Sequence, residues 1–297
     1  MKKYLNLSVV IFALIICKIS EAQNVGITDK SGGITPASTL QVHKNATSGA
    51  VLQVTNTNTG ETSADGLIIN RQAGSFGIIN QENDTINIGG SANSGSHLSI
   101  EPDGTLVMKG QSTVFNDLMV FPDATSKGSS NQPTWQSFKN NGESPKSSQG
   151  VFLWMFSPTE EQEVYFTIQI PHSYKVGTSI YPHVHWTTTT GTPSGTDVVW
   201  GLEYTVMKIG GNFGNTTLIT SNTVITPIGK PTKTSQHLIT AFPTISGDGI
   251  EISTILVCRL YRYVADANDT FGNSVGLLGF DIHYESDTQG SHTEYTK

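Results

Sequence analysis

Residues 150–209 (GVFLWMFSPTEEQEVYFTIQIPHSYKVGTSIYPHVHWTTTTGTPSGTDVVWGLEYTVMKI) decide the fold, because apolar and polar residues alternate in three separate runs. The runs cover residues 163–170, 181–186 and 198–206. Side chains two residues apart lie on the same face of a strand, so each run predicts a strand with one buried face. The pattern therefore indicates a β-domain with its core on one side of each strand.

Similar segments continue to the end of the chain. The candidate strands are residues 151–156, 163–170, 181–188, 198–209, 216–226, 234–242, 250–263 and 275–285. Turns rich in Gly, Pro, Asn and Ser separate them, which favours antiparallel connections. We therefore predict an all-β fold, with residues 150–297 forming a jelly-roll-like antiparallel β-sandwich head domain.

Composition narrows the class of partner. Charged residues make up 14% of the chain, against roughly 25% in ordinary soluble domains. The formal net charge is −7, and Lys and Arg form no run. A surface of this kind suits an extracellular β-protein and excludes nucleic acid as the expected partner.

The first 22 residues have the pattern of a secretory signal peptide. Lys2 and Lys3 precede the apolar run 5–16, and small residues lie at the expected cleavage site after Ala22. A membrane-spanning helix needs about 20 apolar residues, so this run is too short. We expect an exported protein, located outside the cell, on its surface or in the periplasm, with no membrane span in the mature chain.

Cysteine usage excludes an intrachain disulfide in the mature protein. Cys17 would leave with the signal peptide, and Cys258 would remain alone. Cys258 lies in an apolar strand pattern, which favours a small buried side chain over a nucleophile. Packing or association must then stabilise the protein.

Residues 23–111 differ from the head in their pattern of apolar and polar residues. Short apolar runs recur there between clusters of Asn, Gly, Ser and Thr, and residues 102–104 (PDG) predict a hairpin turn. Strands this short struggle to form a core of their own. We predict a β-repeat stalk whose core is shared between copies, most simply in a homotrimer. Residues 112–149 are predicted to connect stalk and head and to include a strand at 114–121.

Two pairs of residues, each containing histidine, suggest a metal site. His183 and His185 share a strand face and lie about 7 Å apart along it, and Asp281 and His283 repeat this spacing. Glu203 also lies on a polar strand face. Imidazole and carboxylate are the ligands of divalent transition metals, so these five residues form a candidate cupin-like site. Alternatively, each is a hydrogen-bonded polar residue, or His183 and His185 from three chains meet on a trimer axis.

Residues 266–273 (DANDTFGN) form a second candidate cation site. Several side-chain oxygens could bind calcium there. The order differs from an EF-hand, since Phe271 occupies the glycine position and no Glu closes the loop. An ordinary polar turn is therefore the favoured interpretation of this segment. No other cofactor is expected.

The motifs of common enzymes are missing from the sequence. It contains no G-x-S-x-G, H-E-x-x-H, Walker or dinucleotide-binding pattern, so no catalytic residue is assigned. Aromatic residues offer a different function, because exposed rings stack on sugars. The candidates are Trp135, Tyr165, Tyr174, Tyr181 and Tyr261. Each of them can also belong to the core.

Several segments resemble phage proteins. Residues 24–27 (NVGI) with 38–43 (STLQVH) resemble the opening of secreted bacterial proteins with tail-fibre-like β-repeats. Residues 98–106 (LSIEPDGTL) resemble shaft repeats of bacteriophage tail fibres and tailspikes. The resemblance implies a trimeric fibre or knob that binds a surface.

The head is similar to uncharacterised β-sandwich domains of phage and prophage structural proteins. The similarity runs from residues 116–118 (NDL) through 182–186 (PHVHW) to 286–291 (SDTQGS). The family implies no activity that can be carried over. Virion proteins need no signal peptide, so residues 1–22 favour an exported relative encoded by a host.

These observations lead to one main functional hypothesis. We expect a non-enzymatic extracellular structural or adhesive protein that binds a surface glycan or another cell-surface component. One alternative is a metal-binding β-sandwich using the histidine pairs. Another is an enzyme acting on polysaccharide, which would need paired carboxylates in a groove.

Overall fold

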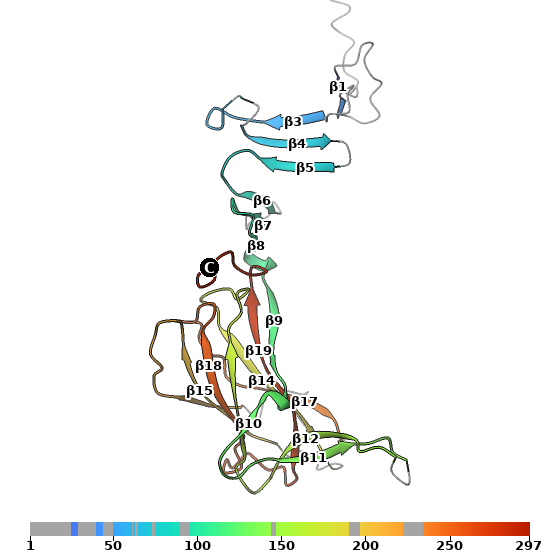
Figure 1. Ribbon diagram of the computed structural model, residues 1–297, viewed down its shortest axis with the longest axis vertical. Coiled ribbons are helices and arrows are strands. Elements are labelled where there is room, and N and C mark those ends of the chain that lie inside the picture. The colour runs from blue at the N-terminus through green and yellow to red at the C-terminus, as the bar shows by residue number, and fades with distance from the viewer. Residues whose placement is uncertain are drawn as a thin grey trace, which may run out of the picture. The chain divides into compact units, whose positions relative to one another are not determined.

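The computed structural model describes residues 25–28, 40–43, 50–60, 62, 65–72, 75–89, 96–143, 147–189, 197–221 and 234–297. The predicted signal peptide, residues 1–22, lies outside these ranges. Strands dominate the described part (Figure 1), which confirms the all-β prediction. Its helices are two turns of 3-10 helix, η1 (Gly110–Ser112) and η2 (Pro122–Ala124). Within the described ranges, no helix is long and apolar enough to cross a membrane.

The chain divides into two compact units, Met1–Ile86 and Asn87–Lys297. In the first, β1 (Val25–Thr28) pairs in parallel with β2 (Leu40–His43). An antiparallel sheet follows, formed by β3 (Ala50–Val54), β4 (Leu67–Gln72) and β5 (Ser75–Asn80). The predicted stalk, residues 23–111, therefore extends past the end of this unit.

A second three-stranded sheet follows in the chain. It contains β6 (Ile86–Gly89), β7 (Ser96–Ile100) and β8 (Leu106–Met108). β7 and β8 form the hairpin that residues 102–104 predict. Gly104 has φ +86 and donates its N–H to the carbonyl of Glu101 at 2.8 Å. Glycine adopts this left-handed conformation without strain, which explains the turn.

Two antiparallel sheets form the head sandwich. The sheet named here the β18 sheet contains, in spatial order, β10 (Ser126–Lys127), β13 (Glu163–Gln169), β18 (Ile255–Arg262), β15 (Trp200–Met207) and β16 (Thr217–Thr220). The β19 sheet contains β11 (Thr134–Lys139), β12 (Val151–Phe156), β19 (Val275–Ser286), β14 (Ile180–Thr188) and β17 (His237–Ala241). β9 (Val114–Val120) also pairs with β19. In Figure 1, β15 and β18 lie on one side of the head and β9 and β19 on the other.

All eight predicted head strands overlap an observed strand. The segment 112–149 contributes more than the single strand predicted for it, since β9, β10 and β11 belong to the two sheets of the sandwich. β11 was not predicted, because Thr134–Lys139 lies in a stretch rich in Pro, Gly and Ser, a composition typical of loops.

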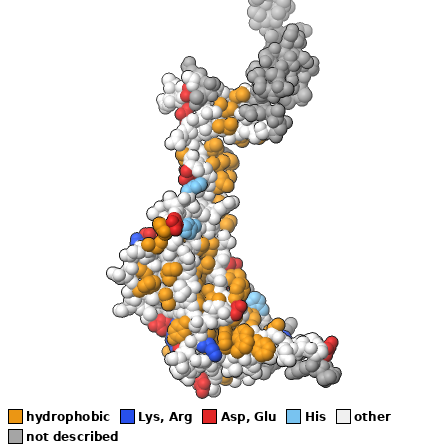
Figure 2. Space-filling model, in the orientation of Figure 1, with side chains coloured by type: hydrophobic (Ala, Val, Ile, Leu, Met, Phe, Trp, Pro, Cys, Tyr) orange, Lys and Arg blue, Asp and Glu red, His pale blue; other side chains and the backbone are white. Residues whose placement is uncertain are grey.

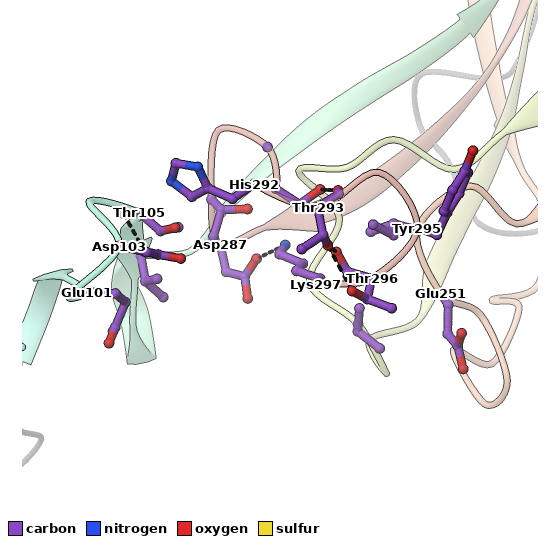
Figure 3. A pocket seen from close by; sticks show the side chains of 16 residues that line it. Glu101, Asp103, Thr105, Glu251, Asp287, His292, Thr293, Tyr295, Thr296 and Lys297 are labelled. Carbon is purple, nitrogen blue, oxygen red and sulfur yellow. Dashed lines mark hydrogen bonds and ion pairs between the residues drawn. The ribbon is translucent and has the colours of Figure 1, made fainter.

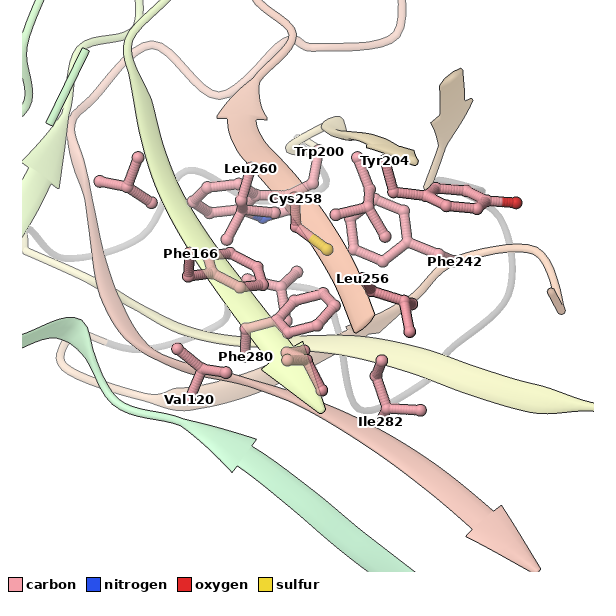
Figure 4. Packing of buried hydrophobic residues seen from close by; sticks show 14 of the residues in the cluster. Val120, Phe166, Trp200, Tyr204, Phe242, Leu256, Cys258, Leu260, Phe280 and Ile282 are labelled. Atoms are coloured by element: carbon pink, nitrogen blue, oxygen red, sulfur yellow. The ribbon is translucent and has the colours of Figure 1, made fainter. Parts of the chain in front are cut away.

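The core lies between the two sheets (Figure 4). Phe166 of β13 packs against Phe280 of β19, with ring centroids 4.9 Å apart. Trp186 and Trp200, one from each sheet, are fully buried. Burying a large apolar side chain contributes roughly 1.5–3 kcal/mol, so this double layer stabilises the head.

Cys258 belongs to this core, as its strand pattern predicts. Its sulfur points among Leu256, Leu260 and Tyr204 (Figure 4). Burial raises the pKa of the thiol to about 12. The reactive thiolate is therefore scarce at neutral pH.

A buried ion pair anchors the loop that follows β18. The side chain of Arg262 is completely buried, and its Nε and Nη2 donate to the carboxylate of Asp269 at 3.0 and 2.7 Å. The same guanidinium donates to the carbonyls of Phe271 and Asn273. A buried charge is tolerated only when it is paired in this way. The loop conformation therefore depends on Arg262.

Replacing Arg262 should destabilise the head strongly. Arg262→Leu leaves the buried Asp269 carboxylate without its counter-charge, although the backbone N–H of Val199 still donates to it, and this costs about 3–5 kcal/mol. Urea unfolding followed by tryptophan fluorescence measures this loss. Arg259→Leu is the matched control, because Arg259 is partly exposed and its partners Glu161 and Glu163 reach solvent. The prediction fails if both variants lose the same stability, or if Asp269→Leu added to Arg262→Leu restores none of it.

Cys258 should be inert in the folded protein. In a Cys17→Ser variant, Cys258 is the remaining cysteine. We expect Ellman's reagent at pH 8 to react over hours with the native protein and within minutes in urea. Burial both withholds the sulfur and suppresses the thiolate. Fast reaction of the native protein would contradict the buried position.

Candidate functional site

Four of the five predicted ligand residues come together on the outer face of the β19 sheet. On β14, Val184 and Trp186 are fully buried in the core, so His183 and His185 point outward. On β19, Phe280 and Ile282 point into the core. The register pairs His183 with Asp281 across the two strands. Period-two alternation on adjacent strands thus places both pairs on one surface.

The carboxylate of Asp281 lies among the three imidazoles. Its Oδ2 is 3.3 Å from Nε2 of His185 and 3.4 Å from Nε2 of His283. Its Oδ1 is 3.9 Å from Nδ1 of His183. One ligand atom each of His183, Asp281 and His283 lies within 4.8 Å of the others. The rings of His183 and His283 have centroids 4.4 Å apart.

Two atoms of this cluster are buried without a hydrogen-bond partner. They are Oδ1 of Asp281 and Nδ1 of His183. Asp281 is 3% exposed, although it points away from the core. Burial lowers the pKa of His183, and its electrostatic interaction with His283 lowers it further. Both effects favour the neutral imidazole, whose ring nitrogen offers a lone pair.

Two residues that the sequence analysis did not include extend the cluster. Asp117 of β9 lies opposite His283, and its Oδ1 is 3.1 Å from Nε2 of that histidine. His237 of β17 shares a hydrogen bond with His185, with 2.8 Å between Nε2 and Nδ1. Burial and the electrostatic interaction with His185 lower the pKa of His237. Both residues lie in predicted strand segments, but nothing in the sequence indicates which strands neighbour β14 and β19.

Glu203 lies apart from the cluster. It belongs to β15 of the β18 sheet, where Leu202 and Tyr204 point into the core and Glu203 points outward. Its carboxylate lies 3.5 Å from Arg259 and accepts a hydrogen bond from Thr216 at 2.7 Å. The outer faces of the β18 and β19 sheets point in opposite directions. The prediction that Glu203 is a ligand was wrong for this reason.

The oxygens of the candidate calcium loop face Arg262. Asp269 and the carbonyls of Phe271 and Asn273 accept its hydrogen bonds, as described above. Asp266 accepts hydrogen bonds from the backbone and side chain of Asn268. A guanidinium thus occupies the position at which those three oxygens converge.

An aromatic strip, defined by Trp135, Phe152 and Trp154, lies on the hairpin of β11 and β12. Trp135 and Phe152 are 46% and 36% exposed, with ring planes 20° apart and centroids at 6.3 Å. Trp154 lies 4.6 Å from Trp135, and Nζ of Lys127 is 5.1 Å from its ring. Hydrophobic side chains gather over this hairpin in the lower part of Figure 2. The strip is a patch of apolar rings open to solvent.

The strip continues the core face of the β19 sheet. Trp154 lies two residues before Phe156 in β12, so the two side chains share a strand face. Phe156 is fully buried in the core. The register pairs Trp135 with Trp154 and Ser137 with Phe152, so all four side chains lie on that face. The rings are exposed because β11 and the start of β12 extend beyond the covered part of the core.

The other candidate sugar-binding aromatics divide between surface and interior. Tyr174 and Tyr261 are buried, and Tyr261 packs over Gly201. Tyr165 is 38% exposed on the β18 sheet. Tyr181 packs edge-on against Phe115, with centroids 5.5 Å apart. Tyr174 and Tyr261 therefore cannot stack on a ligand.

A cavity of about 670 Å³ lies between residues 101–107 and the last residues of the chain (Figure 3). Lys297 forms an ion pair with Asp287 beside it, and Asp103 accepts a hydrogen bond from the backbone N–H of Thr105. Glu251 forms an ion pair with Lys208. Of the charged groups that line the cavity, Lys297 and Asp287 thus pair with each other, while Asp103 and Glu251 interact with Thr105 and Lys208.

Comparisons with known proteins leave the family open. No protein-family model and no curated protein matches the chain. Among solved structures, the chain is similar to the CBM22-1–GH10 modules of endo-1,4-β-D-xylanase 10B from Clostridium thermocellum, complexed with xylohexaose. That match has 12% identity and a TM-score of 0.26, and covers 62% of this chain and 29% of the other. A second match is the enzymatically active domain of tailspike protein 4 of bacteriophage CBA120, with 9% identity, a TM-score of 0.21, and coverage of 58% and 19%. The chain thus spans less than a third of either structure.

Proposed function

We propose that the protein is a non-enzymatic extracellular adhesive protein whose head binds a glycan on a cell surface. The observation that carries this proposal is the aromatic strip of Trp135, Phe152 and Trp154. The resemblance of residues 98–106 to the shaft repeats of tail fibres supports it independently. The signal-peptide pattern of residues 1–22 supports export as the route to that location.

The chemistry of the strip suits a sugar. Pyranose rings present an apolar face of C–H groups and a rim of hydroxyls, and flat aromatic rings bind the apolar face. Trp135 and Phe152 offer two nearly parallel rings for this contact. Ser137, opposite Phe152, and Lys127, beside Trp154, supply polar groups at the rim. Sites of this kind combine apolar walls with a few placed polar groups.

A self-associating stalk completes the proposal. One face of the β3–β5 sheet is largely apolar: it carries Leu52, Val54, Leu67, Ile69, Phe76 and Ile78, with Asn80 opposite Leu67 and Arg71 opposite Phe76. Four of these side chains are between 41% and 66% exposed within one chain. A sheet with one apolar face must bury that face against another element. We propose that copies of this chain supply that layer, most simply in a trimer that presents three heads together.

Removing the central ring of the strip should weaken glycan binding. We expect the protein to bind a subset of glycans on an array, and Trp135→Ala to lower the affinity for the best of them about tenfold or more, a loss of ~1.4 kcal/mol. Isothermal titration measures the affinity. Tyr165→Ala, which removes an exposed ring from the other sheet, should leave it unchanged. An array without hits, or equal affinities for both variants, would overturn the glycan assignment.

A charge on the apolar face should separate the chains. We expect light scattering after size exclusion to give three times the chain mass for the protein and a smaller mass for Ile78→Asp. A buried carboxylate without a partner opposes association. Thr57→Asp, in the turn before β4, adds the same charge away from this face and should leave the mass unchanged. A monomeric parent protein would contradict the shared layer.

A further inference from the structure

The outer face of the β19 sheet carries a cluster of side chains that the adhesive proposal does not use. We propose that His183, His185, Asp281 and His283 bind one divalent transition-metal ion within each chain. This inference concerns the opposite face of the sheet from the aromatic strip. The metal-binding proposal can therefore be tested independently of glycan binding.

The distances fit coordination. Zinc binds imidazole nitrogen and carboxylate oxygen at 2.0–2.2 Å, so neighbouring ligands of a tetrahedral ion are about 3.3 Å apart. Asp281 Oδ2 lies 3.3 Å from His185 Nε2 and 3.4 Å from His283 Nε2. His183 Nδ1 and Asp281 Oδ1, at 3.9 Å, need a shift of only some tenths of an ångström. His183, Asp281 and His283 are thus already grouped near the spacing that an ion requires, and His185 contacts the same carboxylate.

The two unpartnered atoms point to a missing cation. A buried carboxylate oxygen without a hydrogen bond is costly, and so is a buried imidazole nitrogen. Asp281 Oδ1 and His183 Nδ1 are both in this condition, on facing residues of paired strands. One metal ion would satisfy both atoms at once. The hydrogen bonds within the cluster do not reach Asp281 Oδ1 or His183 Nδ1.

The surrounding residues resemble the outer layer of a metal site. A ligand histidine usually presents one ring nitrogen to the metal and holds its other nitrogen in a hydrogen bond. His185 has this arrangement, with Nε2 toward Asp281 and Nδ1 bonded to His237. Asp117 lies at the exposed edge beside His283, where the side chains are 55% and 39% exposed. An ion can enter from that edge.

The donor set selects the class of metal. Three imidazoles and one carboxylate suit zinc, iron, nickel or copper, whereas calcium and magnesium prefer oxygen ligands throughout. The bound ion would tie β14 to β19, the two strands that carry the ligands. Binding to the folded state alone also raises stability.

The test is a titration of the intact protein with zinc after removal of metals by a chelator. We expect one equivalent per chain by isothermal titration, and a higher melting temperature with zinc. Calcium should produce neither effect. Cobalt(II) should give the visible absorption of a site with nitrogen ligands, a signal independent of stability.

Variants locate the ion. His183→Ala and His283→Ala should each weaken zinc binding at least tenfold, and His283 is exposed enough to be replaced without loss of the fold. His292→Ala, at the distant cavity, is the matched control and should bind zinc as the parent does. The proposal is overturned if zinc does not bind or if both cluster variants keep full affinity. It is also overturned by one zinc per three chains, which would place the ion between copies.

Discussion

The pairing of β19 with its neighbours on both sides is the constraint on which the head depends. β14 pairs with it on one edge, while β12 and β9 pair with successive parts of the other. A single register therefore sets two environments, because Phe280 and Ile282 enter the core while Asp281 and His283 reach the outer face. A slip by one residue would exchange these environments, which burial of large apolar side chains forbids.

The same sheet positions both proposed binding surfaces. The aromatic strip lies on the hairpin of β11 and β12, on the face that continues the core. The histidine cluster lies on the opposite face, over β14 and β19. The two surfaces can therefore act independently, one through apolar stacking and the other through ligand lone pairs. Their common support is a sheet made rigid by its core.

The two compact units differ in how much of their apolar surface is buried within the chain. The head buries its large side chains between two sheets of the same chain, and it pins one loop with the buried pair of Arg262 and Asp269. The β3–β5 sheet instead leaves Phe76 and Ile78 exposed. Self-association of that sheet would give the chain an N-terminal assembly unit and a head that folds by itself.

The sequence by itself determined the strands of the head and the face on which most of their side chains lie. Alternation with period two is a local property, so it predicted that Val184 and Trp186 are buried and that His183 and His185 are not. It also placed Asp281 and His283 on one strand face. Only the tertiary structure decided which strands are neighbours, and this removed Glu203 from the cluster and added Asp117 and His237. The physical reason is that pairing joins segments far apart in the chain, through core packing that no local pattern records.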